Sequence, residues 1–133
     1  MDVLFVCVGN AARSQMAKGF YNALARRTRA ESAGTEPAER VSRKAVQVMA
    51  ERGIDISMEK PRLLTEEMAA RAGMVVTMGC LSRNSCPVFL KGCGKKLVDW
   101  ALPDPKGGTI EDYRRVRDEI ERRVKKLVRE MEG

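Results

Sequence analysis

The 133-residue sequence predicts one α/β domain spanning residues 1–133, with a parallel, doubly wound sheet. Short apolar runs rich in valine alternate with stretches of helical periodicity, and this alternation is typical of strands joined by crossover helices. The chain is also long enough to bury a real hydrophobic core but too short for two domains. We therefore expect ligands to bind beyond the carboxyl ends of the strands.

The first expected strand, Asp2 to Val8, is almost continuously apolar, which is typical of a strand buried on both faces. A brief second strand is expected over residues 30–33, closed by Gly34. The apolar runs 74–78 and 96–100 predict the third and fourth strands.

A helix is expected from about Arg13, with Met16, Phe20 and Leu24 facing inward. Residues 41–52 predict a second helix that turns Ala45, Val48 and Met49 inward and stops at Gly53. A short helix opens at Thr65-Glu66-Glu67 and runs through Arg71, because an acidic pair suits a helix N-terminus.

The last helix has the clearest pattern. Thr109 is the expected N-cap, with Asp112 three residues later. Its inward positions recur at helical spacing: Ile110, Tyr113, Val116, Ile120, Val124, Leu127 and Met131.

The net charge of +7, from 25 basic and 18 acidic residues, raises the question of nucleic-acid binding. The basic residues are spread through every segment and only six residues are aromatic, so we expect a positive surface that favours anionic substrates and no nucleic-acid partner. The apolar stretch Val3 to Val8 is far too short to span a membrane, and nothing resembles a signal peptide. We expect a cytoplasmic monomer with no membrane partner.

Four cysteines, Cys7, Cys80, Cys86 and Cys93, occur in a chain without histidine. In a chain without an export signal, cysteines are more often catalytic or redox-active than disulfide-bonded. Mixed Cys/His zinc sites are excluded, and an all-cysteine site would take Cys7 out of the motif described next. No metal or other cofactor is therefore predicted.

The segment after the first strand has the residues of an oxyanion loop. Cys7 and Arg13 are separated by five residues between a strand and a helix, and the loop consists of Val8, Gly9, Asn10, Ala11, Ala12, Arg13 and Ser14. Its small residues let successive N–H groups turn inward around a tetrahedral anion, and the helix N-terminus adds positive potential. Arg13 suits two-pronged anion binding, and the same field favours the thiolate form of Cys7.

This loop, read as Val6 to Ala17, resembles the signature of low-molecular-weight protein tyrosine phosphatases and of the arsenate reductases built on the same fold. Ser32-Ala33-Gly34-Thr35 and Gly53-Ile54-Asp55-Ile56-Ser57 are also similar to segments shared by both groups. The resemblance implies a three-layer α/β/α fold with a four-stranded parallel sheet, Cys7 as nucleophile and Arg13 as anion clamp.

Asp104, flanked by Pro103 and Pro105 after the fourth expected strand, is the candidate general acid. On its own, an Asp-Pro pair is more often a turn initiator than a catalytic site. The resemblance favours catalysis, because the Asp-Pro of both groups supplies the acid or base.

The remaining cysteines favour reduction over hydrolysis. The segments around Cys80 and Cys86 resemble the redox segment of the arsenate reductases, which implies that Cys80 attacks the arsenate adduct and Cys86 relays the disulfide. Cys93 is the alternative relay. A thioredoxin-like dithiol is the implied reductant, and arsenate or a phosphate-like oxyanion the substrate.

Two other functions stay open: a tyrosine phosphatase with a phosphocysteine intermediate, and a phosphocysteine carrier protein. Neither Lys106-Gly107-Gly108 nor Glu36-Pro37-Ala38 contains an aromatic residue to wall a phenyl ring, so we expect an open pocket for a small inorganic anion. Lys18 stands where some reductases carry an acidic potassium ligand, so no potassium site is expected.

Overall fold

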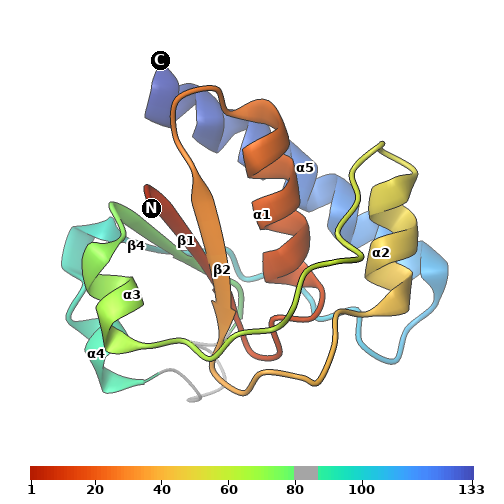
Figure 1. Cartoon of the computed structure of the whole chain (residues 1–133), viewed down its shortest axis with the longest axis horizontal. Coiled ribbons are helices and arrows are strands. Elements are labelled where there is room, and N and C mark those ends of the chain that lie inside the picture. Colours follow the sequence, from red (N-terminus) through yellow and green to blue (C-terminus); the bar gives the residue numbers. More distant parts are fainter. Residues whose placement is uncertain (80–86) are drawn as a thin grey trace.

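The computed structural model describes residues 1–79 and 87–133, and its centre is a parallel sheet (Figure 1). Strands β1 (Val3–Cys7), β2 (Ala30–Gly34), β3 (Met74–Thr77) and β4 (Leu97–Asp99) pair in the order β2-β1-β3-β4. Every pair is parallel, with Cys7 opposite Gly34 and Thr77 opposite Asp99. The predicted parallel sheet of four strands is confirmed; β2 extends one residue beyond the expected 30–33, and the other three strands are shorter than expected.

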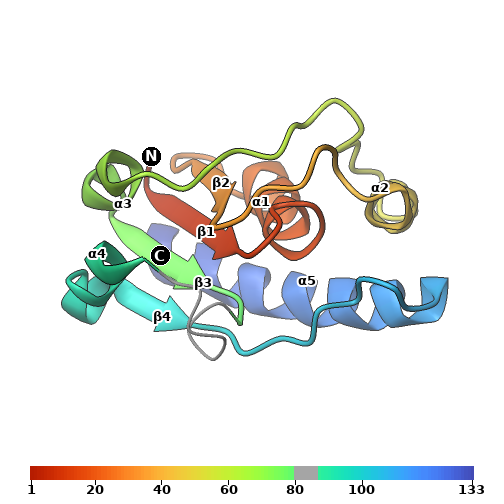
Figure 2. The same cartoon turned by 90° about the horizontal axis from the view of Figure 1, so that it is seen from below.

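Helices cover both faces of the sheet (Figures 1 and 2). Helices α1 (Arg13–Leu24), α2 (Arg43–Ala50) and α5 (Ile110–Glu132) lie on one side, whereas α3 (Glu66–Arg71) and α4 (Val88–Lys91) lie on the other. A single turn of 3₁₀ helix, η2 (Gly94–Lys96), leads into β4. These are the three layers that the sequence predicts.

The central strand β1 divides the core into two clusters. Val3, Phe5 and Cys7 pack with α1, α2 and α5, whereas Leu4 and Val6 pack with α3 and α4. Successive strand residues point to opposite faces, so a strand buried on both faces must be apolar throughout. This requirement is why residues 3–7 read as one continuous apolar run.

Two expectations about helices are wrong. Leu24, predicted to face inward, is 40% exposed. Each residue advances 100° around a helix, so Leu24 lies about 80° around from Met16 and has left the apolar stripe. The second helix is shorter than residues 41–52, because Ser42 caps it by accepting a hydrogen bond from the N–H of Ala45, and the helix proper ends at Ala50.

The last helix begins as predicted. Thr109 and Asp112 form a reciprocal capping box, in which each side chain accepts a hydrogen bond from the other residue's N–H. Helices α4 and η2, by contrast, were not anticipated, since each is only one turn long and carries no periodic pattern.

Candidate active site

Cys7 ends β1 at the carboxyl edge of the sheet, and Arg13 opens α1 after a five-residue loop. Cys7 is 2% exposed and Arg13 4% exposed, so the sequence places a thiol and a guanidinium in the interior at the point where strand becomes helix. Burial of such groups is costly unless polar partners surround them. The loop supplies those partners.

The carbonyl groups of the loop are turned outward by a neighbouring segment, residues 35–42. Four backbone N–H groups of that segment donate to loop carbonyls: Thr35 to Cys7 (3.2 Å), Glu36 to Val8 (2.8 Å), Ala38 to Gly9 (2.9 Å) and Ser42 to Ala11 (2.9 Å). Satisfying the carbonyls on the outside leaves loop N–H groups free for a ligand on the inside. The loop therefore has the geometry of an anion cradle.

Asn10 maintains the shape of the loop. It is the only described non-glycine residue with positive φ, 51°, a region that asparagine tolerates better than most residues. Its side-chain oxygen accepts hydrogen bonds from the N–H of Arg62 (2.9 Å) and from Gln15 Nε2 (3.2 Å). Its Nδ2 donates to Ser14 Oγ at 2.7 Å.

The sulfur of Cys7 is within hydrogen-bonding distance of two groups. The N–H of Asn10 donates to Sγ at 3.2 Å, and Ser14 Oγ lies 2.9 Å from Sγ. Since Ser14 Oγ already accepts the hydrogen bond from Asn10, its own hydrogen is available to Sγ. Both contacts stabilise negative charge on the sulfur.

Arg13 joins three segments of the chain. Its Nη1 donates to the carbonyl oxygens of Met78 (2.6 Å) and Leu102 (3.1 Å), which follow β3 and β4. Its Nη2 lies 3.4 Å from Asp104 Oδ2. A side chain at Gly79 would put a Cβ only 2.8 Å from Arg13 Nη1, which explains a glycine there.

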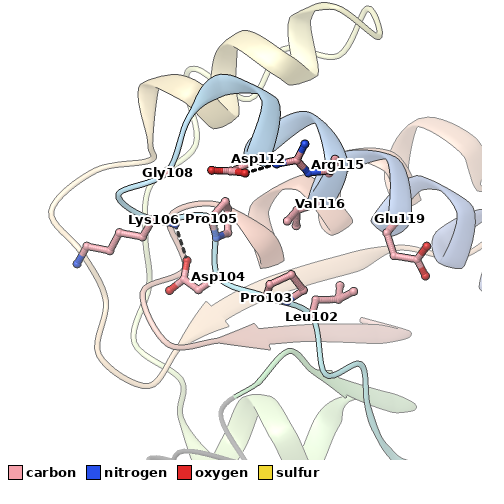
Figure 3. A pocket seen from close by; sticks show the side chains of 10 residues that line it. All are labelled: Leu102, Pro103, Asp104, Pro105, Lys106, Gly108, Asp112, Arg115, Val116 and Glu119. Atoms are coloured by element: carbon pink, nitrogen blue, oxygen red, sulfur yellow. Dashed lines mark hydrogen bonds and ion pairs between the residues drawn. The ribbon is translucent and has the colours of Figure 1, made fainter.

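Asp104 lies at the mouth of the site, with its side chain 31% exposed. Its Oδ1 accepts a hydrogen bond from the N–H of Lys106 at 3.0 Å (Figure 3). Pro103 and Pro105 restrict the backbone on either side, so the carboxyl group has a fixed direction. Of the predicted catalytic residues, Cys7, Arg13 and Asp104 meet in one place.

The cavity containing these three residues has a volume of about 520 Å³. Its floor is the oxyanion loop, and its walls include Glu36, Ala38 and Lys106 from the segments that the sequence placed beside the pocket, together with two residues that it missed, Ser42 and Tyr113. Tyr113 was predicted only as a core position, yet it also lines this cavity. The expected pocket without an aromatic wall is therefore wrong in this respect, because the ring comes from α5.

A second cavity of about 400 Å³ shares Asp104 and Lys106 with the first (Figure 3). Leu102, Val116 and the prolines of the loop form its apolar surface. Glu119 also lines this cavity, and hydrogen bonds from Arg122 and Arg123 lower the pKa of Glu119 to about 2.

The predicted redox pair, Cys80 and Cys86, lies outside the described residues. Cys93 is described: it follows α4, is half-buried, and packs with the α3–α4 cluster. Within residues 1–79 and 87–133, no group of three or more cysteine or acidic residues is arranged to hold a metal ion. No helix in the same residues is both long and apolar enough to cross a membrane.

Residues 2–133 match the family of low molecular weight phosphotyrosine protein phosphatases. The chain belongs to this family. Its sheet order and the loops that contain Cys7 and Asp104 thus belong to a family member, and the resemblance read from the Cys7 loop is confirmed.

Relatives in the family have different named activities. An arsenate reductase of Staphylococcus haemolyticus is 36% identical over 119 residues, covering 89% of this chain and 88% of the relative. The structure of an arsenate reductase from Archaeoglobus fulgidus is 38% identical, covers 96% of this chain and 98% of its own, and has a TM-score of 0.76. An arginine phosphatase from Geobacillus stearothermophilus is 30% identical, covers 98% and 92%, and has a TM-score of 0.86.

Proposed function

We propose that this protein is an arsenate reductase that reduces arsenate to arsenite through a Cys7–arsenate adduct and a relayed disulfide. The observation that carries the proposal is the meeting of Cys7, Arg13 and Asp104 in one cavity above an anion cradle. The additional cysteines of the sequence and the arsenate reductases among the relatives favour reduction over hydrolysis.

The first step forms the adduct. The Cys7 thiolate attacks arsenic, an S–As bond forms, and one As–O bond breaks. The cradle N–H groups and Arg13 bind the three oxygens that remain, where negative charge increases. Asp104 gives a proton to the departing oxygen, which leaves as water.

The second step transfers two electrons. The Cys80 thiolate attacks Sγ of Cys7, and the S–As bond breaks with its electron pair staying on arsenic. Arsenic(V) becomes arsenic(III) and leaves as arsenite, while the two thiols are oxidised to a disulfide. Ser14 is in position to donate a hydrogen bond to Cys7 when its thiolate re-forms.

Cys86 then attacks Cys80, which releases Cys7 and leaves a Cys80–Cys86 disulfide for a thioredoxin-like dithiol to reduce. The position of Cys93 supports Cys86 in this role. Cys93 precedes β4, at the amino edge of a parallel sheet, whereas Cys7 ends β1 at the carboxyl edge. A strand of three or four residues spans about 10–13 Å, so about that length separates Cys93 from the edge where the disulfide of Cys7 with Cys80 would form. A disulfide needs its two Cα atoms within about 7 Å, which disfavours Cys93 as the relay.

Phosphatase activity is the second candidate. The cavity is larger than an inorganic oxyanion needs, and the arginine phosphatase structure is a close structural match. Hydrolysis would use Cys7, Arg13 and Asp104 but neither Cys80 nor Cys86. A phosphocysteine carrier would need no acid, so the position of Asp104 argues against that function.

The test compares two reactions in three variants. Cys7→Ser is expected to abolish both thioredoxin-coupled arsenate reduction and aryl phosphate hydrolysis, because a hydroxyl is not ionised near neutral pH. Cys80→Ser should stop multiple-turnover reduction and spare hydrolysis. Cys93→Ser is the matched control, expected to leave both reactions unchanged.

Retention of reduction in Cys80→Ser would contradict the proposal and favour the phosphatase. Peptide mapping after one turnover without reductant should find the Cys80–Cys86 disulfide in the wild type. In Cys86→Ser the disulfide should instead stop between Cys7 and Cys80. A Cys80–Cys93 disulfide in the wild type would assign the relay to Cys93.

A further inference from the structure

Tyr113 is a wall of the catalytic cavity that the proposed mechanism does not use. It lies in the first turn of α5, is 5% exposed, and lines the same cavity as Cys7 and Arg13. Its hydroxyl oxygen accepts a hydrogen bond from Ser42 Oγ at 3.2 Å. A buried tyrosine hydroxyl beside an anion cradle is a candidate for direct contact with the ligand.

The hydrogen of the Tyr113 hydroxyl is free for such a contact. A phenol has one hydrogen to donate and lone pairs to accept with. Ser42 gives its hydrogen to Tyr113, and Ser42 Oγ accepts in turn from the N–H of Ala45 at 3.4 Å. In residues 1–79 and 87–133 no other acceptor is within hydrogen-bonding distance of the Tyr113 hydroxyl, so its hydrogen is left for the cavity.

Hydrogen bonds fix the position of Tyr113 relative to the oxyanion loop. The N–H of Ser42 donates to the carbonyl oxygen of Ala11 in the oxyanion loop at 2.9 Å, so one residue contacts both the loop and the tyrosine. Lys44 Nζ lies 5.9 Å from the ring centroid of Tyr113 and donates to the carbonyl oxygen of Gly108 at 2.6 Å. The ring is thus fixed between the start of α2 and the start of α5.

A tetrahedral anion in the cradle directs one oxygen toward the cavity mouth. The loop N–H groups and Arg13 can surround three oxygens, because the nucleophile approaches from the floor. The fourth oxygen therefore faces the walls of the cavity, which Asp104 and Tyr113 both line. An oxygen with two lone pairs accepts hydrogen bonds from both.

We propose that the Tyr113 hydroxyl donates a hydrogen bond to the outward-facing oxygen of the bound oxyanion, with Ser42 as the positioning residue. The site then selects ligands that have an oxygen at the mouth. The inference rests on the proposed function only for the identity of the anion, since phosphate is bound by the same contacts.

The test is a double comparison of two variants with two ligands. Phosphate puts an oxygen at the mouth, whereas methylphosphonate fills the cradle with three oxygens and leaves a methyl group there, which accepts no hydrogen bond. Affinity is measured as protection of Cys7 from iodoacetamide, with the alkylated peptide quantified by mass spectrometry. Tyr21→Phe is the matched control, because the Tyr21 hydroxyl contacts Thr28 at 2.7 Å, outside the cavity.

Tyr113→Phe is expected to weaken phosphate binding about tenfold, the lower range for a hydrogen bond to a charged group. Methylphosphonate binding should change less than twofold, and Tyr21→Phe should change neither. Equal weakening of both ligands, or phosphate binding within twofold of wild type, would overturn the proposal.

Ser42→Ala tests the positioning role. It should weaken phosphate binding by less than Tyr113→Phe does, and the double variant should bind no worse than Tyr113→Phe alone. An additive loss would mean that Ser42 acts on the loop independently of Tyr113. Thermal unfolding of each variant monitors the loss of the α2 cap. If the wild type fails to reduce arsenate while these phosphate effects appear, the proposed function falls and the Tyr113 contact stands.

Discussion

Gly34 ends β2 beside the oxyanion loop, and its substitution by alanine should disable the site without touching a catalytic group. A Cβ at this position would lie 2.6 Å from the carbonyl oxygen of Val8, 2.9 Å from Cβ of Asn10 and 3.0 Å from the N atom of Asn10. Two of these contacts are with backbone atoms, which cannot rotate away. The loop itself must move.

The required movement can be read from the shortest contact. Opening it from 2.6 Å to a barely tolerable 3.0 Å needs a shift of 0.4 Å (3.0 minus 2.6). Catalytic groups must be held within about 0.5 Å of their productive positions, so this shift uses most of the tolerance. We expect Gly34→Ala to weaken anion binding roughly 10- to 100-fold and to destabilise the fold by about 1–3 kcal/mol.

Phosphate protection of Cys7 from alkylation measures the binding loss, and denaturant unfolding measures the stability loss. Gly92→Ala is the control, since its added Cβ would be 3.4 Å from its nearest neighbour, the carbonyl oxygen of Phe89. If Gly34→Ala binds phosphate as the wild type does, the loop is more compliant than its hydrogen bonds to residues 35–42 imply, and the reasoning fails.

Two further predictions concern charge. Arg13→Lys should weaken arsenate and phosphate binding roughly 100-fold in a direct binding assay. A lysine loses the second contact to the anion and the hydrogen bonds to the carbonyl oxygens of Met78 and Leu102. A loss below tenfold would refute this role. Hydrogen bonds to the Glu132 carboxylate, chiefly from the N–H of Arg26 and then from Thr28 and Arg27, lower the pKa of Glu132 from its usual 4.5 to about 2. The ionised carboxylate therefore stabilises the fold fully above about pH 4.5, and this stabilisation is lost as the pH falls toward 2. Glu132→Gln should therefore unfold more easily than wild type at pH 7, with the difference in urea midpoint closing between about pH 4.5 and 2; a difference independent of pH would exclude this linkage.

The sequence predicted the site wherever the determining contacts are local. Cys7, Asn10 and Arg13 lie within one strand–loop–helix unit, whose residue types specify a buried strand end, a left-handed turn and a helix start. The placement of Asp104 needed more, because its ion pair with Arg13 joins segments about ninety residues apart. The parallel topology supplied that link by bringing the carboxyl ends of the strands to one edge.

Wall residues could not be predicted in the same way. Helical periodicity shows that Tyr113 faces inward, but it does not say whether the facing surface is core or cavity. Ser42 is similar: the sequence placed it inside the expected helix 41–52, and only the packing of α2 against α5 brings it to Tyr113. Leu24 failed for a different reason: its spacing looked helical, but 100° per residue carries it about 80° around from Met16 and off the apolar stripe.

The outward-turned carbonyls of the oxyanion loop have a consequence for how the family diversifies. The cradle is held by backbone hydrogen bonds from residues 35–42 and, inside the loop, by the side chain of Asn10, so the side chains of residues 35–42 are largely spared from maintaining it. Mutations at the walls can therefore alter what is accepted at the mouth while the floor keeps its hold on a tetrahedral anion. A floor built from main chain and walls built from side chains let one scaffold acquire new substrates by single substitutions, which accords with relatives named for both reduction and dephosphorylation.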